Sequence, residues 1–257
     1  MNGKQIINIF EQLYPTNLAY SWDNIGLQVG TINKEINNIL LTLDLTLEVV
    51  DEAIKNNIDL IIAHHPLIFS PIKAIETDTY KGKVIEKLIK SDIALYAAHT
   101  NFDVSTYGMN TILANMLNLK NQEILELTTE KEGLGKVGTV SSVSMKDYIT
   151  IVKNTFKVNN ARFIGDFNKT VNKVAITGGS GSSTINSASN FGVDLLITGD
   201  ISYHQAHDAL ALNLNVLDIG HNIEKFFVNE LKNILIDKGI NVNILISSID
   251  TDPYKFV

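Results

Sequence analysis

Short apolar runs alternate with helical patterns from one end of this chain to the other, and that alternation restricts the folds open to it. The runs are bounded by turn residues, as buried strands are, and helical periodicity fills the intervals between them. Strands separated by helices predict an α/β fold with largely parallel sheets. The strands are predicted at residues 39–43, 60–63, 93–98, 137–143, 161–164, 174–177, 195–198, 216–219 and 242–246. The helices are predicted near residues 47–55, 80–90, 110–117, 145–156, 183–190, 203–212 and 223–238.

The two halves of the chain resemble each other. A shift of 135 residues brings residues 39–42 onto 174–177, 59–62 onto 194–197, and 64–65 onto 199–200. Residues 98–103 resemble 220–224 at a different shift. Apolar strands can match by chance, but constant spacing favours an internal duplication. We therefore expect a first α/β lobe at 1–125 and a second at 126–257, with a polar linker at 119–136.

Composition excludes several classes of protein. With no cysteine, the chain has no disulfide, no thiolate nucleophile and no Cys-type metal site. The net charge of −7 argues against a nucleic-acid coat, and Arg162 is the only arginine, so bidentate clamps on phosphate are nearly unavailable. No apolar run approaches the roughly 20 residues that span a bilayer. The first residues lack the pattern of a signal peptide, and we expect a cytoplasmic protein.

Two adjacent histidines, His64 and His65, follow the predicted strand at 60–63 and precede Pro66. Neighbouring side chains point to opposite faces inside a strand, but a turn at its end can direct both imidazoles to one side. Parallel sheets bind ligands outside the carboxyl ends of their strands. The pair therefore predicts a ligand site there, outside the core, although two histidines can also simply complete a turn.

Further possible ligands follow two other predicted strands. His99 and Asp103 come after 93–98, and His221 and Glu224 come after 216–219. A carboxylate three or four residues past a histidine returns to the same side if a helical turn begins there. Taken singly, Asp103 is typical of a helix cap and Glu224 of a first helical turn. Together these residues exceed the ligands that one catalytic zinc ion takes from a protein, and they suit two ions in a cleft between the lobes. Nitrogen and oxygen ligands fit Zn, Mn, Fe or Ni.

Two more features lie at strand ends in the second half. Asp200 and His204 are spaced one helical turn apart, which suits partners of the metal ligands or a general acid and base. His207 is typical of a solvated helix residue. The glycine-rich run at 178–183 resembles an anion cradle of backbone amides, but a tight turn with a serine cap explains it equally well. Trp22 has no obvious chemistry, and a lone tryptophan is usually a packing residue.

These segments together resemble the Nif-three family, whose members are named as homologues of GTP cyclohydrolase I type 2. The matching segments are Ser-Trp-Asp-Asn-Ile-Gly-Leu-Gln-Val-Gly at 21–30, Ala-His-His-Pro at 63–66, His-Thr-Asn-Phe-Asp at 99–103, Gly-Gly-Ser-Gly at 178–181, Thr-Gly-Asp-Ile-Ser-Tyr-His at 198–204 and Gly-His-Asn-Ile-Glu at 220–224. The resemblance implies a dinuclear metal site, two related lobes and a hexameric ring. It assigns the metal ligands to His64, His65, Asp103, His221 and Glu224.

Two functions from different classes fit this sequence. The first is a metal-dependent hydrolase of a nucleotide or related small anion, with opening of the GTP ring as the named candidate and with Asp200, His204 or His99 moving protons. The second is a non-catalytic metal-binding, regulatory or metal-chaperone assembly. A fold and a metal site do not determine a reaction, so the sequence leaves both open.

Overall fold

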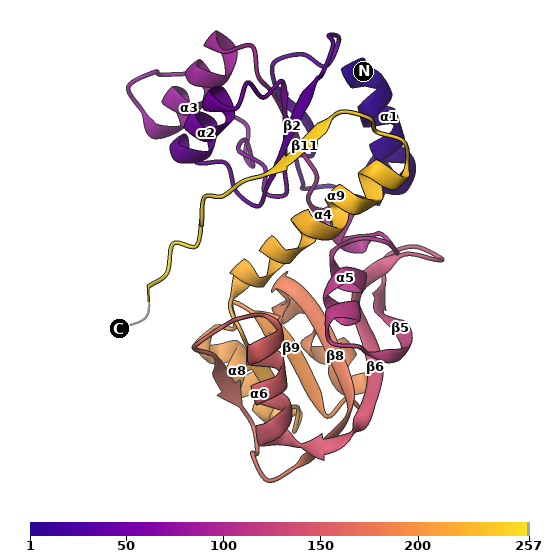
Figure 1. Cartoon of the computed structure of the whole chain (residues 1–257). Helices are drawn as coiled ribbons and strands as arrows, with labels where there is room; N and C mark the ends of the chain where they lie inside the picture. The colour runs from indigo at the N-terminus through magenta and orange to yellow at the C-terminus, as the bar shows by residue number, and fades with distance from the viewer. Residues whose placement is uncertain (256–257) are drawn as a thin grey trace. The chain divides into compact units, whose positions relative to one another are not determined.

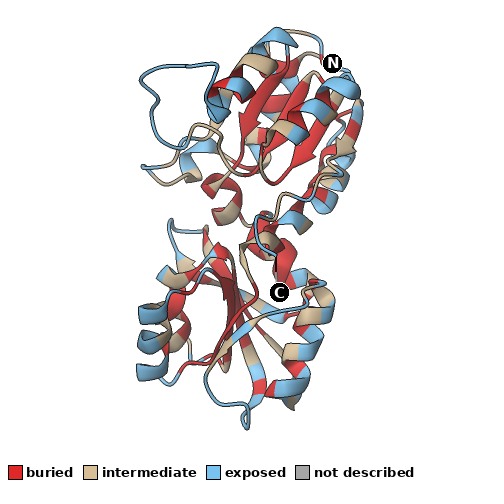
Figure 2. Ribbon diagram, turned by 90° about the vertical axis from the view of Figure 1, so that its left-hand side faces the viewer, coloured by how far each residue is buried: buried red, intermediate tan, exposed pale blue. Residues whose placement is uncertain are grey.

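The computed structural model describes residues 1–255 as two compact units. Unit 1 comprises residues 1–102 and 227–255, and unit 2 comprises residues 103–226. Each unit is built around its own sheet (Figure 1). The central strands of both sheets are buried, whereas the outer faces of the helices are exposed (Figure 2). Within the described residues, no helix has the length and apolar character that crossing a bilayer requires.

Unit 1 has a sheet of strand order β1-β4-β3-β2-β11, parallel throughout except for β1 at one edge. Helices α2 and α3 cover one face, where Val49 and Leu88 pack with Ile61. Helix α1 packs on the other face, where Phe10 contacts Tyr96. The elements are α1 (Gly3–Leu13), η1 (Thr16–Leu18), β1 (Gly26–Val29), β2 (Asn38–Thr42), α2 (Leu47–Lys55), β3 (Leu60–Ala63), α3 (Tyr80–Lys90), β4 (Ala94–Ala97), α9 (Phe227–Asp237) and β11 (Asn243–Ile246).

Unit 2 has a sheet of strand order β5-β6-β8-β9-β10-β7. Only β8, β9 and β10 run parallel, so the prediction of largely parallel sheets is correct for unit 1 and wrong for unit 2. The elements are α5 (Met109–Met116), β5 (Lys120–Leu127), β6 (Gly133–Ser144), α6 (Met145–Thr155), β7 (Arg162–Ile164), β8 (Thr170–Ser180), η2 (Ser182–Thr184), α7 (Ile185–Asn190), β9 (Leu195–Gly199), α8 (Tyr203–Ala211), β10 (Val216–Asp218) and η3 (His221–Phe226). Helix α4 (Thr100–Val104) contains the boundary between the units.

The predicted duplication is present in the strand register. Ile39 of β2 pairs with Leu60 of β3, and Val174 of β8 pairs with Leu195 of β9, which is a shift of 135 residues in both strands. A third parallel strand follows in each unit, and an antiparallel strand completes that edge: β4 with β1, and β10 with β7. The chain is therefore an α/β protein of two related units.

Equivalent aspartates hold equivalent turns in the two copies. Asp59 Oδ2 accepts hydrogen bonds from the backbone amides of residues 37 and 38, at 2.7 and 2.9 Å. Asp194 Oδ2 accepts the same pair from residues 172 and 173, both at 2.8 Å. These contacts fix the start of the first parallel strand against the start of the second in each unit, because an ionised carboxylate strengthens the bonds it accepts.

The register corrects one detail of the predicted repeat. Ala98 and Ile219 donate equivalent backbone bonds, to the carbonyl oxygens of residues 63 and 198. His99 is therefore equivalent to Gly220, and not to His221 as the sequence comparison suggested. The two histidines occupy neighbouring, not identical, positions in the two copies.

The predicted linker at 119–136 is wrong, because β5 and the start of β6 form an antiparallel pair there. The sequence of β5 is polar because this strand lies at the edge of its sheet and one face meets solvent. The last predicted strand belongs to the first sheet, where β11 pairs with β2. The compact units thus divide the chain at 102/103 and 226/227, and not into 1–125 and 126–257. Helix α1 and strand β1 were not predicted.

Candidate metal centre

His64 lies directly after β3 and is completely buried. Its backbone amide donates to the carbonyl of Thr42, which continues the parallel ladder past the end of the strand. Its Nδ1 lies 2.8 Å from the carbonyl oxygen of Ala98. A carbonyl oxygen can only accept, so Nδ1 carries the hydrogen and Nε2 is the atom that can bind a metal.

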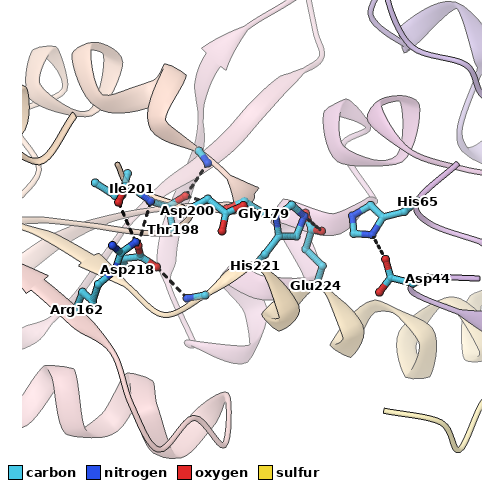
Figure 3. Close-up of polar contacts among 12 residues, drawn as sticks. Asp44, His65, Arg162, Gly179, Thr198, Asp200, Ile201, Asp218, His221 and Glu224 are labelled. Atoms are coloured by element: carbon cyan, nitrogen blue, oxygen red, sulfur yellow. Dashed lines mark hydrogen bonds and ion pairs between the residues drawn. The ribbon is translucent and has the colours of Figure 1, made fainter. Parts of the chain in front are cut away.

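Carboxylates hold the other two histidines of unit 1 in the same way. His65 Nδ1 lies 2.7 Å from Asp44 Oδ1 (Figure 3), and His99 Nδ1 lies 3.0 Å from Asp23 Oδ1. Ligand atoms of His64, His65 and His99 all lie within 4.8 Å of one another. Metal-binding histidines commonly donate their second ring nitrogen to a carboxylate or a backbone carbonyl, and all three residues follow that pattern.

The prediction that the histidine pair lies outside the core is wrong for His64. Its ring contacts Phe102 and Phe227, with centroids 6.1 and 5.5 Å away. These rings close the apolar side of the imidazole, while His65 remains partly exposed. Replacing His64 therefore removes packing as well as a ligand atom.

Unit 2 contains a fourth histidine with the same arrangement, His221. His221 Nδ1 lies 2.7 Å from Asp200 Oδ2, and Nε2 lies 3.0 Å from Glu224 Oε2 (Figure 3). Both residues lie on η3, so the predicted turn that brings a carboxylate back three residues after the histidine is present. Glu224 is buried, with 3% of its surface exposed, and a buried carboxylate requires a positive or hydrogen-bonding partner. Asp103 lies on α4 and accepts a hydrogen bond at its backbone oxygen from Asn110.

The glycine-rich run makes room for the side chains of His221 and Glu224. A side chain at Gly179, whose φ is +57°, would begin 2.5 Å from Glu224 Oε1 and 3.2 Å from His221 Nε2. The amides of Gly178 and Gly181 donate to Asn110 and to Thr198. The run is therefore a close-approach segment and not an anion cradle, because two of its amides are already used within the protein.

The single arginine has a structural role beside His221. Arg162 donates to the buried carboxylate of Asp218 and to the carbonyl oxygen of Ile201 (Figure 3). Asp218 also accepts the amides of Ile201 and Gly220, both at 3.0 Å. These bonds fasten the segments that carry Asp200 and His221 at the ends of β9 and β10.

The predicted proton-transfer residues lie in three different settings. Asp200 precedes α8 with a φ of +57°, and Ser202 caps that helix, so Asp200 and His204 are not one helical turn apart. His204 is exposed and contacts the ring of Tyr203. Asp200 instead orients His221, and His99 lies within the histidine cluster of unit 1.

Sequence reasoning missed the carboxylates that hold the rings. Asp44 follows the end of β2, and Asp23 follows Trp22 in the segment that gave the family resemblance. The sequence offered one signal for Asp44. It is an acidic residue just after the strand that comes before the strand leading to His65. Trp22 contacts Tyr20, Phe69 and His99, yet 57% of it is exposed.

The donor set suits a divalent transition metal. Imidazole nitrogens and carboxylate oxygens match Zn, Mn, Fe and Ni, and the oxygen acceptors at Nδ1 leave Nε2 as the ligand atom of each ring. The buried carboxylate of Glu224 also gains a counter-charge when a cation binds.

Comparisons with known proteins agree on one family. The model of Duf34/NIF3 (NGG1p interacting factor 3) matches residues 1–253. A "GTP cyclohydrolase 1 type 2 homolog" of Clostridium perfringens is 38% identical, and the match covers 100% of each chain. A protein of the same description from Bacillus subtilis is 33% identical, covering 100% of this chain and 99% of its own. The crystal structure of a Bacillus cereus protein related to NIF3 has a TM-score of 0.95 at 34% identity, covering 100% of this chain and 99% of its own.

Replacing Gly179 tests the close approach to Glu224. In Gly179→Ala the new methyl group overlaps the carboxylate, which adds roughly 1–3 kcal/mol of overpacking to the cost of about 1 kcal/mol for a left-handed alanine. Gly192→Ala is the matched control, since its φ is +64° and nothing lies within 4 Å of the added carbon. Urea unfolding should show a larger loss of stability for Gly179→Ala. Equal losses would contradict the assignment.

Asp23 predicts an acid-sensitive contribution to stability. Burial would raise its pKa, but the hydrogen bonds from His99 and Thr100 and the charge of His99 outweigh burial and lower the pKa from 3.8 to about 2. The contribution is therefore fully present above pH 3.8 and disappears as the pH falls through about 2. The difference in unfolding free energy between the wild type and Asp23→Asn should shrink over that range. The exposed control Asp78→Asn should show no such trend.

Proposed function

This chain belongs to the Duf34/NIF3 family, and from that premise we propose that it binds two divalent metal ions through His64, His65, Asp103, His221 and Glu224. The observation that carries the proposal is common to both units. Nδ1 of each proposed histidine ligand lies within 2.8 Å of an oxygen acceptor, so the ring is oriented and Nε2 is its ligand atom.

The proposal of two ions follows from the number of ligands. Three imidazoles and two carboxylates exceed the three protein ligands that a catalytic zinc ion usually takes. His64 and His65 of unit 1 and Asp103, His221 and Glu224 of unit 2 would supply those ligands. The identity of the metal is a choice among Zn, Fe, Mn and Ni, which this donor set binds in common.

For the reaction, we propose hydrolysis of a nucleotide or related small anion, as in a GTP cyclohydrolase. A bound divalent ion acidifies water and polarises a substrate oxygen. Within the chain, His99 is the best-placed residue to move a proton, because Asp23 orients its ring through Nδ1 and the ring lies in the histidine cluster of unit 1. Asp200 keeps His221 in its binding tautomer. The only argument for His204 as a proton-transfer residue is that it belongs to the segment at 198–204, which resembles the family.

The alternative is a non-catalytic metal-binding, regulatory or metal-chaperone role. Two observations favour it: the only arginine is bonded to Asp218, and the amides of Gly178 and Gly181 are bonded within unit 2. Both are groups that could otherwise hold a substrate phosphate, and their engagement leaves the metal and lysines for that task. Both roles require bound metal, so only a measurement of turnover can distinguish the hydrolase from the non-catalytic protein.

Metal content tests the binding proposal. Protein purified without chelator should contain close to two ions per chain by elemental analysis, and it should lose them below about pH 6 as the histidines protonate. Trp22, the only tryptophan, contacts His99 at 6.1 Å, so its emission should be quenched when Co²⁺ or Ni²⁺ binds.

The matched variants are two double substitutions. His64→Ala with His65→Ala should abolish binding, with circular dichroism as the check on folding because His64 is buried. His204→Ala with His207→Ala removes two exposed histidines from α8 and should leave the metal content unchanged. Full metal retention by the first double variant would sink the ligand assignment.

Assembly, location and partners are further proposals. We propose a cytoplasmic homo-oligomer, a hexameric ring by resemblance to the family, whose small-molecule ligand is an anion and which binds neither membrane nor nucleic acid. Closed symmetric assemblies are the common outcome for soluble oligomers. Light scattering at micromolar concentration should give a mass near six chains, and a monomer mass would overturn the proposal.

Turnover separates the two candidate functions. Metal-loaded wild type should slowly convert GTP or a related phosphorylated compound, and chelated wild type and Glu224→Gln should not. His204→Ala should retain activity if His99 alone moves the proton, whereas His99→Gln should lose turnover while keeping the metal. Equal rates in all samples would indicate a contaminant. No turnover by the loaded wild type across nucleotides and phosphoesters would favour the non-catalytic role.

A further inference from the structure

The segment after β11 continues past the sheet toward the C-terminus (Figure 1, yellow), and its first residues are fastened to unit 1 by side chains. Ser247 Oγ donates to Glu52 Oε2 at 2.5 Å. Ser248 donates to Glu52 Oε1 from its amide and its hydroxyl, at 2.8 and 2.6 Å. Ile249 packs against the core between the sheet and α2. Residues 247–249 are therefore held on unit 1 by contacts that do not involve residue 251.

Thr251 then reaches the carboxylate that orients a proposed metal ligand. Its Oγ1 donates to Asp44 Oδ2 at 2.7 Å, and the other oxygen of the same carboxylate, Oδ1, lies 2.7 Å from His65 Nδ1. The two residues that share this carboxylate, His65 and Thr251, lie far apart in the sequence. Each oxygen of Asp44 has its own hydrogen-bond donor, so the plane of the carboxylate is fixed from both sides.

We propose that Thr251 is a positioning residue for metal binding: by holding Asp44, it fixes the tautomer and orientation of His65. The inference rests on the proposed function for its metal, but its geometry lies wholly within unit 1. An aspartate carboxylate turns readily about its last torsion, which is broad. A hydroxyl on its far oxygen removes that freedom and keeps Oδ1 directed at the imidazole.

The expected loss of metal affinity follows from the place of Thr251 in a chain of hydrogen bonds. Thr251 bonds Asp44, and Asp44 bonds the proposed ligand His65. Loss of a hydrogen-bond partner of a metal ligand typically weakens metal affinity by about 10–100-fold. Thr251 is one bond further away, so we expect about a 10-fold weakening, near the lower end of that range. The fold should persist, because the bonds to Glu52 and the packing of Ile249 hold the segment in place.

Three full-length variants separate positioning from general fastening. Thr251→Val removes the hydroxyl and keeps the shape, and Thr251→Ser keeps the hydroxyl. Ser248→Ala removes hydrogen bonding from the same segment without touching Asp44. The first readout needs no metal: long-range ¹H–¹⁵N spectra of the chelated protein report the tautomer of His65, identified by its absence in His65→Gln. The second readout is the Kd for Zn²⁺, measured by competition with a chromophoric chelator.

We expect the chelated wild type, Thr251→Ser and Ser248→Ala to show His65 protonated at Nδ1 only, and Thr251→Val to show tautomer averaging. The Kd for Zn²⁺ should rise about 10-fold in Thr251→Val alone. The inference is overturned if Thr251→Val matches the wild type in either readout, or if Ser248→Ala has an equal effect. If the wild type binds no Zn²⁺, the proposed function fails, and the tautomer alone decides whether Thr251 positions His65.

Discussion

An oxygen acceptor at Nδ1 of each clustered histidine is the contact on which the proposed centre depends. A histidine placed at the end of a strand can rotate, change tautomer or take a proton, and each of these changes removes Nε2 as a ligand. The carbonyl of Ala98 and the carboxylates of Asp44, Asp23 and Asp200 oppose the rotation and the change of tautomer, because each accepts at Nδ1. The acceptors are themselves held by the strand register, by Thr100 and by Thr251, so the geometry of the ligands derives from the sheets.

The two copies of the repeat share their strand pairing but have different polar residues at the strand ends. Two residues after the end of β3, unit 1 has His65, and 135 residues further on unit 2 has Asp200. His65 is held by a carboxylate, whereas Asp200 is the carboxylate that holds a histidine. Asp44 likewise corresponds to Gly179, whose missing side chain makes room for Glu224. Duplication preserved the strand pairing and its aspartates, while the strand ends diverged in chemistry.

Several parts of the fold were predictable because they depend on local pattern. Helices α2 and α3 and strand β3 were predicted with their observed bounds, since threonine caps begin both helices and the strand is apolar throughout. Strand β5 was mistaken for a linker because an edge strand has too little burial to leave an apolar pattern. Strand β11 was assigned to the wrong half because strand pairing depends on long-range contact and not on position in the sequence.

The sequence by itself determined the α/β class, the repeat, and the identities of the histidines and carboxylates proposed as ligands. Only the tertiary structure decided which ring nitrogen each histidine can offer, because the acceptors Ala98 and Asp44 lie 34 and 21 residues from their histidines. It also decided that the glycine-rich run makes room for Glu224 and that Thr251 belongs beside Asp44, 207 residues away. Such contacts leave no periodicity in the sequence, since they arise where separate strands and segments of the folded chain meet.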